Sequence, residues 1–540
     1  MEIVFVILAL LVAVTVSGTA ERILPIPLPL IQIAFGVGLA LSPLPSAVLN
    51  PEIFFLLLLP PLLFLDGWRI PKAALRQDGR LILALALGLV VFTVVGIGLL
   101  IHALIPSMPV AVAFALAAVL APTDPIAVSA IAKQAPVPQR LMHILEGESL
   151  LNDASGLVCL RFAVAAALTG SFSPTDAFAT FVWLSLVGVA LGVLVTLAVT
   201  RLQERILSRV GEDPGTQTLL SLLIPFAVYL VAEKVHASGI LAAVSAGITM
   251  SYVENQGRAL ALTRMRRSAV WDTVQLAANG AIFVLLGEQL PVILERASGG
   301  ALLEGGPLRL VLLAVTITAA LAFLRFVWVC VSIALTLRRG RRSGLPRGPF
   351  PFGLALATSL AGVKGAVTLA GILTLPFALA DGSPFPARDL AIFLAMTVIL
   401  VSLLAATLVL PIVLRRIQLP PAPEAVDHER MVRAKAGEAA RDAIQTLRAS
   451  LSRTASDPGL YDEAAVRALQ RYQRYDDGAE ASGTSRGREM VQAERRLRLA
   501  GLRAERDALF DLRRRHTIPD ALLARLIREV DLLETRFAEG

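Results

Sequence analysis

Four polar residues stand inside one apolar stretch, and their spacing puts them on a common helix face. In ILEGESLLNDASGLV, residues 144–158, Glu148 and Asn152 are four positions apart. Ser149 and Asp153 have the same spacing. Side chains four residues apart lie on the same side of an α-helix. This face therefore offers two carboxylates, a hydroxyl and an amide, which are oxygen ligands that suit hard cations rather than zinc.

A second polar site lies in APTDPIA, residues 121–127, where two prolines interrupt an apolar run. Pro122 disfavours helical geometry at the residue before it, and Pro125 suits the first position of a new helix. Asp124 stands directly before Pro125, where a carboxylate caps a helix N-terminus. The sequence therefore predicts a helix broken near Thr123, and such breaks build ion sites in membrane transporters. A simple proline kink is the alternative.

Two further charged residues lie in apolar segments. Lys364 stands between two glycines in GVKGAVTLA, which predicts a second interrupted helix. A cation buried in a membrane requires a partner, and we expect a structural ion pair between Lys364 and Glu148. Asp66, in LPPLLFLDGWRIPK, is either a carboxylate in the vestibule of an ion site or an interface residue paired with Arg69.

The composition indicates the elements that position these residues. Of 540 residues, 56% are hydrophobic and only 17% are charged, and the mean hydropathy is +0.70. These values are typical of an all-α polytopic membrane protein. Apolar runs long enough to span a bilayer predict about 13 helices, placed at 2–19, 23–42, 51–66, 80–104, 109–132, 143–169, 177–206, 216–234, 238–254, 270–295, 307–337, 350–380 and 388–416.

The two predicted breaks also relate the halves of the membrane region. They fall in the fifth and twelfth helices, which enter from opposite sides, so we predict inverted repeats formed by helices 1–6 and 8–13. Basic residues gather in alternate loops, such as residues 338–347. By the positive-inside rule, the N-terminus lies outside and the C-terminus in the cytoplasm. The net charge of +8 is thereby explained without a nucleic-acid partner.

The chain changes character near Leu419, where it becomes polar, charged and helix-favouring. Segments such as EAAVRALQRYQRY have apolar residues three or four positions apart, which is typical of amphipathic helices. We therefore predict a membrane domain over 1–418 and a cytoplasmic α-helical domain over 419–540. The second domain is either a folding or dimer-packing appendage or a sensor.

Six motifs together suggest a family. The chain resembles the monovalent cation:proton antiporters, in the sodium/proton exchanger branch, over residues 1–416. The matching motifs, in family order, are LPPLLFLDGW, APTDPIAV, GESLLNDASGLV, HASGILAAVSAG, FVLLGEQL and GVKGAVTLA. The order of all six makes the resemblance specific.

The resemblance implies a site. Asp153 would be the carboxylate that binds both cation and proton, with Asn152 beside it. Thr123 would supply a backbone oxygen and Ser149 a hydroxyl, so that these two residues and Asp153 would ligate Na⁺. Asp124 would balance the helix ends at the break.

Two positions depart from the family pattern. Lys364 stands where the family usually has Arg, and Lys lacks the planar fork that binds a carboxylate through two hydrogen bonds. A helix-3 acid contacts the ion in some members, and Leu65 and Asp66 occupy that neighbourhood here.

The resemblance also implies a function. A homodimer in the plasma (inner) membrane would exchange a monovalent cation, with Na⁺ favoured, for H⁺, electroneutrally and in the service of pH and cation homeostasis. Burial disfavours the ionised form of a carboxylate, so Asp153 would hold either a proton or a cation. We expect no enzyme activity, no cofactor and no ATP, because the chain lacks a GxxxxGK[ST] phosphate loop. A K⁺/H⁺ antiporter, a cation channel or uniporter, and a non-transporting scaffold are the alternatives.

Overall fold

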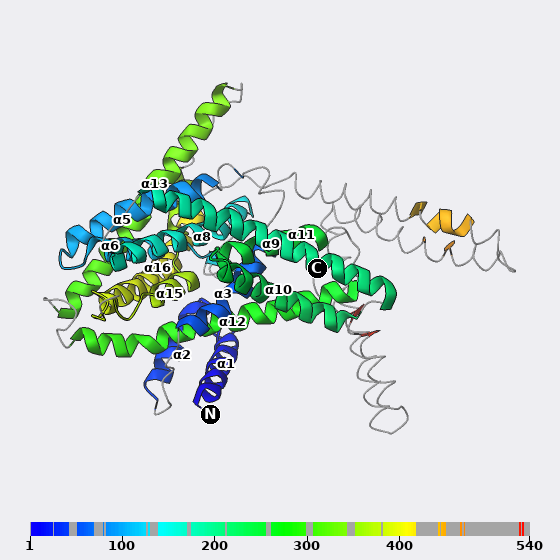
Figure 1. Cartoon of the computed structure of the whole chain (residues 1–540), viewed down its shortest axis with the longest axis horizontal. Coiled ribbons are helices and arrows are strands. Elements are labelled where there is room, and N and C mark those ends of the chain that lie inside the picture. Colours follow the sequence, from blue (N-terminus) through cyan, green and yellow to red (C-terminus); the bar gives the residue numbers. More distant parts are fainter. Residues whose placement is uncertain are drawn as a thin grey trace. The chain divides into compact units, whose positions relative to one another are not determined.

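The computed structural model shows a helical protein (Figure 1). It describes residues 2–24, 26–42, 51–69, 79, 83–125, 128–129, 139–169, 174–210, 213–254, 261–298, 306–342, 352–379 and 382–416, and short stretches between 441 and 533. The chain divides into two compact units, Met1–Gln418 and Leu419–Gly540. The predicted cytoplasmic domain lies mostly outside the described residues, so its role remains a prediction.

The first unit is built from helices throughout its described length. Its first helices are α1 (Glu2–Ala20), α2 (Leu28–Ala40), α3 (Pro51–Arg69), the π-helix η1 (Ala84–Leu89), α5 (Val90–Leu104), α6 (Val110–Leu120) and α8 (Gln139–Thr169). They are followed by α9 (Pro174–Val210), α10 (Pro214–Lys234), α11 (Gly239–Glu254), α12 (Ala261–Ser298), α13 (Gly306–Arg342), α14 (Phe352–Leu360), α15 (Ala366–Leu373) and α16 (Arg388–Arg416). In the described part of the chain, the β-type pairing is confined to an isolated bridge between Ala378 and Pro384.

These helices agree with the predicted all-α membrane architecture. Among the described residues, seven helices are long and apolar enough to cross a membrane, and four shorter apolar helices accompany them. Each predicted span overlaps an observed helix, and the spans 109–132 and 350–380 each overlap an interrupted one. The number of membrane crossings and the inverted repeat remain predictions.

Glycines bring two pairs of helices into unusually close contact. A Cβ atom at Gly36 of α2 would overlap the carbonyl oxygen of Val284 in α12. A Cβ atom at Gly247 of α11 would likewise overlap the carbonyl oxygen of Phe64 in α3. Small residues at such contacts let backbones approach and add van der Waals attraction, which drives helix packing within a bilayer. The pairs α2–α12 and α3–α11 accordingly share the most extensive helix contacts of the described residues.

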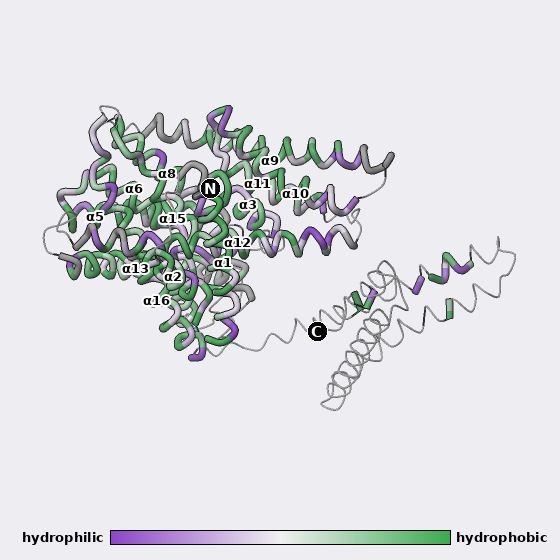
Figure 2. Tube along the Cα trace, turned by 90° about the horizontal axis from the view of Figure 1, so that it is seen from below, coloured by the Kyte–Doolittle hydropathy of each residue, from purple (hydrophilic) through white to green (hydrophobic). Residues whose placement is uncertain are grey.

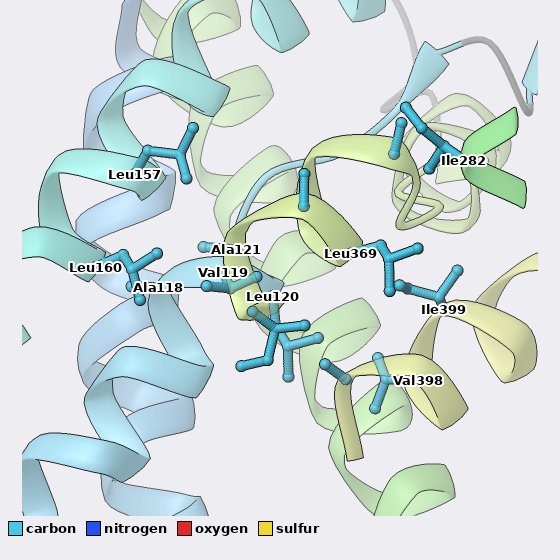
Figure 3. Close-up of a cluster of buried hydrophobic side chains, with 14 of the residues drawn as sticks. Ala118, Val119, Leu120, Ala121, Leu157, Leu160, Ile282, Leu369, Val398 and Ile399 are labelled. Atoms are coloured by element: carbon cyan, nitrogen blue, oxygen red, sulfur yellow. The ribbon is translucent and has the colours of Figure 1, made fainter. Parts of the chain in front are cut away.

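Helix α6 forms the centre of the apolar core. It carries VAVAFALAAVL, and its residues from Ala115 to Leu120 are all buried. A helix that is apolar on every side belongs inside a bundle. Figure 3 shows Leu120 of α6 in one cluster of buried side chains with Leu369 of α15, Val398 of α16 and Leu157 of α8, and α6 contacts all three of these helices. The end of α6 is therefore held among three other helices.

The outer surface of the first unit is also apolar. Large side chains such as Val12, Leu194, Leu308 and Phe323 are exposed on α1, α9 and α13. Figure 2 shows hydrophobic residues along most of the length of these helices. A surface of this kind is expected where helices face lipid rather than water.

The structure adds detail to two of the predicted spans. The span predicted at 80–104 contains the π-helix η1, in which Gly88 lies against the ring of Trp328; a Cβ atom there would clash with that ring. Hydrophobic periodicity does not register one extra residue in a turn, so the π-helix could not be predicted from the sequence. The span predicted at 270–295 is the longer helix α12, because its charged first turns continue the helix beyond the apolar part.

Candidate functional site

Two interrupted helices meet inside the first unit. The chain is not helical over 121–124, after α6, nor over 361–365, between α14 and α15. The backbone N–H of Asp124 donates to the carbonyl oxygen of Val363 at 2.8 Å, which joins the two interruptions directly. The interruptions lie where the sequence predicts them, and α6 does not pass through a simple proline kink.

Asp124 reaches from one interruption to the helix that follows the other. Its Oδ2 accepts a hydrogen bond from the backbone N–H of Ala366, the first residue of α15, at 3.3 Å. A carboxylate at a helix N-terminus satisfies a free N–H group and opposes the positive end of the helix dipole. A Cβ atom at Gly365 would overlap Asp124 Oδ2, so this approach requires glycine. The sequence predicts that Asp124 caps the helix that begins at Pro125. In the structure Asp124 also caps the N-terminus of α15.

Lys364 supplies the opposite charge to the first interruption. Its Nζ donates to the carbonyl oxygens of Ala121 at 3.1 Å and Pro122 at 2.9 Å, just past the C-terminal end of α6. Carbonyl groups at a helix C-terminus lack intrahelical partners and carry negative partial charge. The side chain of Lys364 therefore stabilises the end of α6, and it is itself buried.

The partner of Glu148 differs from the expected one. Arg325 of α13, rather than Lys364, holds this carboxylate: its NH2 donates to Glu148 Oε2 at 2.7 Å, and its NH1 pairs with Oε1. The side chains of Glu148 and Arg325 are only 1% and 5% exposed. Arg325 Nε also donates to the carbonyl oxygen of Thr358 at 3.0 Å. The planar guanidinium makes this two-point contact, which an ammonium group cannot make.

A short hydrogen-bond chain leads from this ion pair towards the first interruption. Thr123 Oγ1 donates to Glu148 Oε1 at 3.4 Å, and Asn152 Nδ2 donates to Thr123 Oγ1 at 3.1 Å. All three side chains are buried. Asn152 thus fixes the Thr123 side chain from α8.

A small cavity opens beside this chain. It measures about 30 Å³, and the polar residues in its lining are Asp66, Thr123, Asp124, Ser149, Asp153, Asn279 and Thr368. A cavity needs only about 10–15 Å³ to hold one water molecule, so the space has room for a small monovalent cation and a water bound to it. Three carboxyl groups around one buried space favour its occupation by protons or cations, because burial disfavours uncompensated negative charge. The cavity brings together Asp153, Ser149 and Thr123, the three predicted ligands.

Asp66 borders the same cavity. Asp66 lines the cavity from α3. Arg69 instead donates to Gln275 Oε1 at 2.7 Å and pairs with Asp272, both on α12. Asp66 therefore lies at the cavity, its role at an ion site remains a prediction, and Arg69 ties α3 to α12.

Comparison with known proteins identifies the family. The family described as sodium/hydrogen exchanger, transmembrane, matches residues 6–416. The chain is a member of the sodium/hydrogen exchanger family. The resemblance drawn from the six motifs is thereby confirmed, and the match covers the whole membrane unit of this exchanger.

Relatives of this exchanger align over its full length. An uncharacterized Na⁺/H⁺ exchanger of Escherichia coli K12, YjcE, is 41% identical, with 100% of both chains covered. A sodium, potassium, lithium and rubidium/H⁺ antiporter of Bacillus subtilis 168 is 37% identical over 100% of this chain and 78% of its own. The structure of the antiporter MjNhaP1 from Methanocaldococcus jannaschii superposes with a TM-score of 0.59 at 18% identity, covering 77% of this chain and 99% of that one. This last likeness supports the fold.

Two residues of the exchanger's site escaped sequence reasoning. Arg325 was visible as a deep charge in α13, but 177 positions separate it from Glu148, and no local pattern connects them. Asn279 is a single amide in the apolar run LAANGAIFVLL of α12. Its only signal is its polarity within a membrane helix, which makes any such residue a functional candidate.

Proposed function

We propose that this exchanger carries a monovalent cation, Na⁺ first, in exchange for H⁺, and that Asp153 is the seat shared by the two ions. The main support for this proposal is the cavity where the two interrupted helices meet. It sets the buried carboxylate of Asp153 beside the oxygens of Ser149 and Thr123, in a space for one small ion.

The exchange follows from competition at one carboxylate. A proton neutralises Asp153 by itself, whereas a cation needs several oxygens to replace its water shell. Ser149 supplies a hydroxyl and Thr123 a backbone oxygen, while Asp124 lies at the cavity wall and adds negative charge. Occupation by one ion makes binding of the other unfavourable. The loaded site is nearer to neutral than the empty one, so it crosses the low-dielectric interior at less cost.

The surrounding charges stay fixed during this cycle. Glu148 is held by Arg325, and Lys364 is held by two carbonyl oxygens. Each of these charges is compensated within the protein, so none needs to exchange a proton. One exchanging carboxylate then gives one cation per proton, and transport is electroneutral. Clamping the membrane potential should leave the rate unchanged, and a steep dependence on potential would count against this stoichiometry.

The setting of the exchanger is part of the proposal. The alternation of basic loops supports a plasma (inner) membrane location with the N-terminus outside and the C-terminal unit in the cytoplasm. We propose a homodimer that works without a cofactor and that serves pH and cation homeostasis.

A second candidate, exchange of K⁺ for H⁺, has its own support. The relative from Bacillus subtilis is described as an antiporter of sodium, potassium, lithium and rubidium. Oxygen ligands accept all these ions, and selectivity depends on cavity size and rigidity. A channel or uniporter would use similar ligands, but it would move cations without moving protons in the opposite direction.

Purified exchanger in proteoliposomes with an internal pH dye tests the proposal. External Na⁺, K⁺ or Li⁺ should each be tried on wild type and on Asp153→Asn. The wild type should drive protons against the cation, and the substitution should abolish this movement. Asp389→Asn makes the same chemical change at an exposed position of α16, and it should transport normally. A flat pH signal with every cation, or full activity in Asp153→Asn, would overturn the proposal.

A further inference from the structure

One side chain in the cavity wall has no role in the site described so far. Asn279 lies on α12 and is 7% exposed. It lines the cavity together with Asp153 and Asp66. Its amide oxygen is buried, and no hydrogen-bond donor reaches it among the described residues. A buried acceptor without a donor destabilises the fold, so its presence beside a cavity calls for an explanation.

The position of Asn279 is fixed by its surroundings. The next residue, Gly280, lies so close to α1 and α2 that a Cβ atom there would come within 2.6 Å of Val14 and 2.9 Å of Gln32. Helix α12 also contacts α3, which carries Asp66, and α15, whose first turn borders the same cavity. The backbone at Asn279 is therefore held from several sides, and its amide lies in the cavity wall in a set place.

We propose that Asn279 is an additional neutral ligand for the transported cation, contributed by α12, and that it sets the affinity for the cation relative to the proton. The inference rests on the proposed cation site at Asp153. The amide oxygen, which accepts no hydrogen bond from the described residues, meets the cation or the last water bound to it. A cation in a small cavity gains from each oxygen dipole around it, whereas a proton on a carboxylate needs no such shell. Loss of the amide should therefore weaken cation binding and leave proton binding nearly unchanged.

Asn279→Leu separates this role from a structural one, because Leu is close to Asn in size and removes the unpartnered polar atom. Thermal unfolding of the purified protein in detergent should be measured with and without Na⁺. The unfolding temperature of the variant without Na⁺ should equal or exceed that of wild type, because replacing an unsatisfied polar group by an apolar one relieves its burial. The increase in unfolding temperature on adding Na⁺ should be smaller in the variant than in wild type, because a ligand that binds more weakly stabilises the folded state less.

Transport in proteoliposomes gives the second measurement. The Na⁺ concentration for half-maximal rate should rise about 10-fold in Asn279→Leu, which corresponds to the loss of one good contact. The maximal rate and the pH dependence at saturating Na⁺ should stay close to wild type. Asn279→Asp keeps an oxygen and should retain Na⁺-dependent stabilisation. Thr196→Val is the matched control, because Thr196 of α9 is fully buried, its hydroxyl lacks a partner among the described residues, and it does not line the cavity.

The outcomes are distinct. If Asn279→Leu behaves like Thr196→Val in both Na⁺ half-saturation and Na⁺-dependent stabilisation, the inference is wrong. It is also wrong if the variant unfolds at a lower temperature and loses maximal rate at unchanged half-saturation, because that is a structural effect. Failure of the proposed function would look different: the wild type would move no protons, or Asp153→Asn would remain active.

Discussion

The two buried carboxylates of α8 have contrasting surroundings. Glu148 and Asp153 lie five positions apart on one helix, and both are buried. Glu148 is bound on both oxygens by Arg325. Asp153 faces a cavity, and no ion pair holds it among the described residues. The presence of a partner, rather than burial, therefore distinguishes the two carboxylates, and ion exchange is our proposal for the one without a partner.

Removal of the partner of Glu148 should give the largest loss of stability. Arg325→Met leaves a buried carboxylate without its cation, and the free energy of unfolding should fall by about 3–5 kcal/mol. The double variant Glu148→Leu/Arg325→Met should recover most of this loss, because an apolar pair of similar volume tolerates burial. Thermal unfolding in detergent measures both. Asp153→Asn should be as stable as wild type, and an equal loss in that variant would erase the contrast between the two carboxylates.

A smaller loss is expected at the interruption after α6. Lys364→Met removes two charge-assisted hydrogen bonds to Ala121 and Pro122, and it should lower stability by about 2–3 kcal/mol. Lys364→Arg keeps the charge near the same carbonyl groups and should restore most of the stability and transport. If Lys364→Met were as stable and active as wild type, the positive charge at the end of α6 would have no structural role.

The pH dependence of transport sharpens the contrast at Asp153. At low pH protons displace the cation from Asp153, so the transport rate falls on the acidic side of the pH profile. If one proton competes with one cation, a tenfold increase in Na⁺ should move this acidic limb about one pH unit lower. A shift of about half a unit would indicate two protons per cation, and it would draw Asp66 into the exchange. If the pH of the acidic limb did not change with the Na⁺ concentration, the two ions would bind at separate sites.

The sequence was most informative where the cause of the structure is local. The span predicted at 388–416 coincides with α16, because length and hydropathy decide a membrane helix. The interruptions near Thr123 and Lys364 followed from proline and glycine chemistry, which acts on adjacent residues.

The sequence was least informative about which charges meet. From the sequence we expected Lys364 to pair with Glu148, whereas in the structure Arg325 holds this carboxylate. That choice depends on how α13 packs against its neighbours, and on the carbonyl groups that the broken α6 offers to Lys364. The position of Asn279 at the cavity was unpredictable for the same reason. Packing of α12 against α1 and α2 decides which of its faces borders the cavity.

The most direct test of the account counts protons released when a cation binds. Purified exchanger in weak buffer, near neutral pH, should be titrated with Na⁺ while the released protons and the bound cation are both measured. The account predicts about one proton per bound Na⁺ in wild type, and neither cation binding nor proton release in Asp153→Asn. Na⁺ binding without proton release, or unchanged release in Asp153→Asn, would contradict the claim that one buried carboxylate serves both ions.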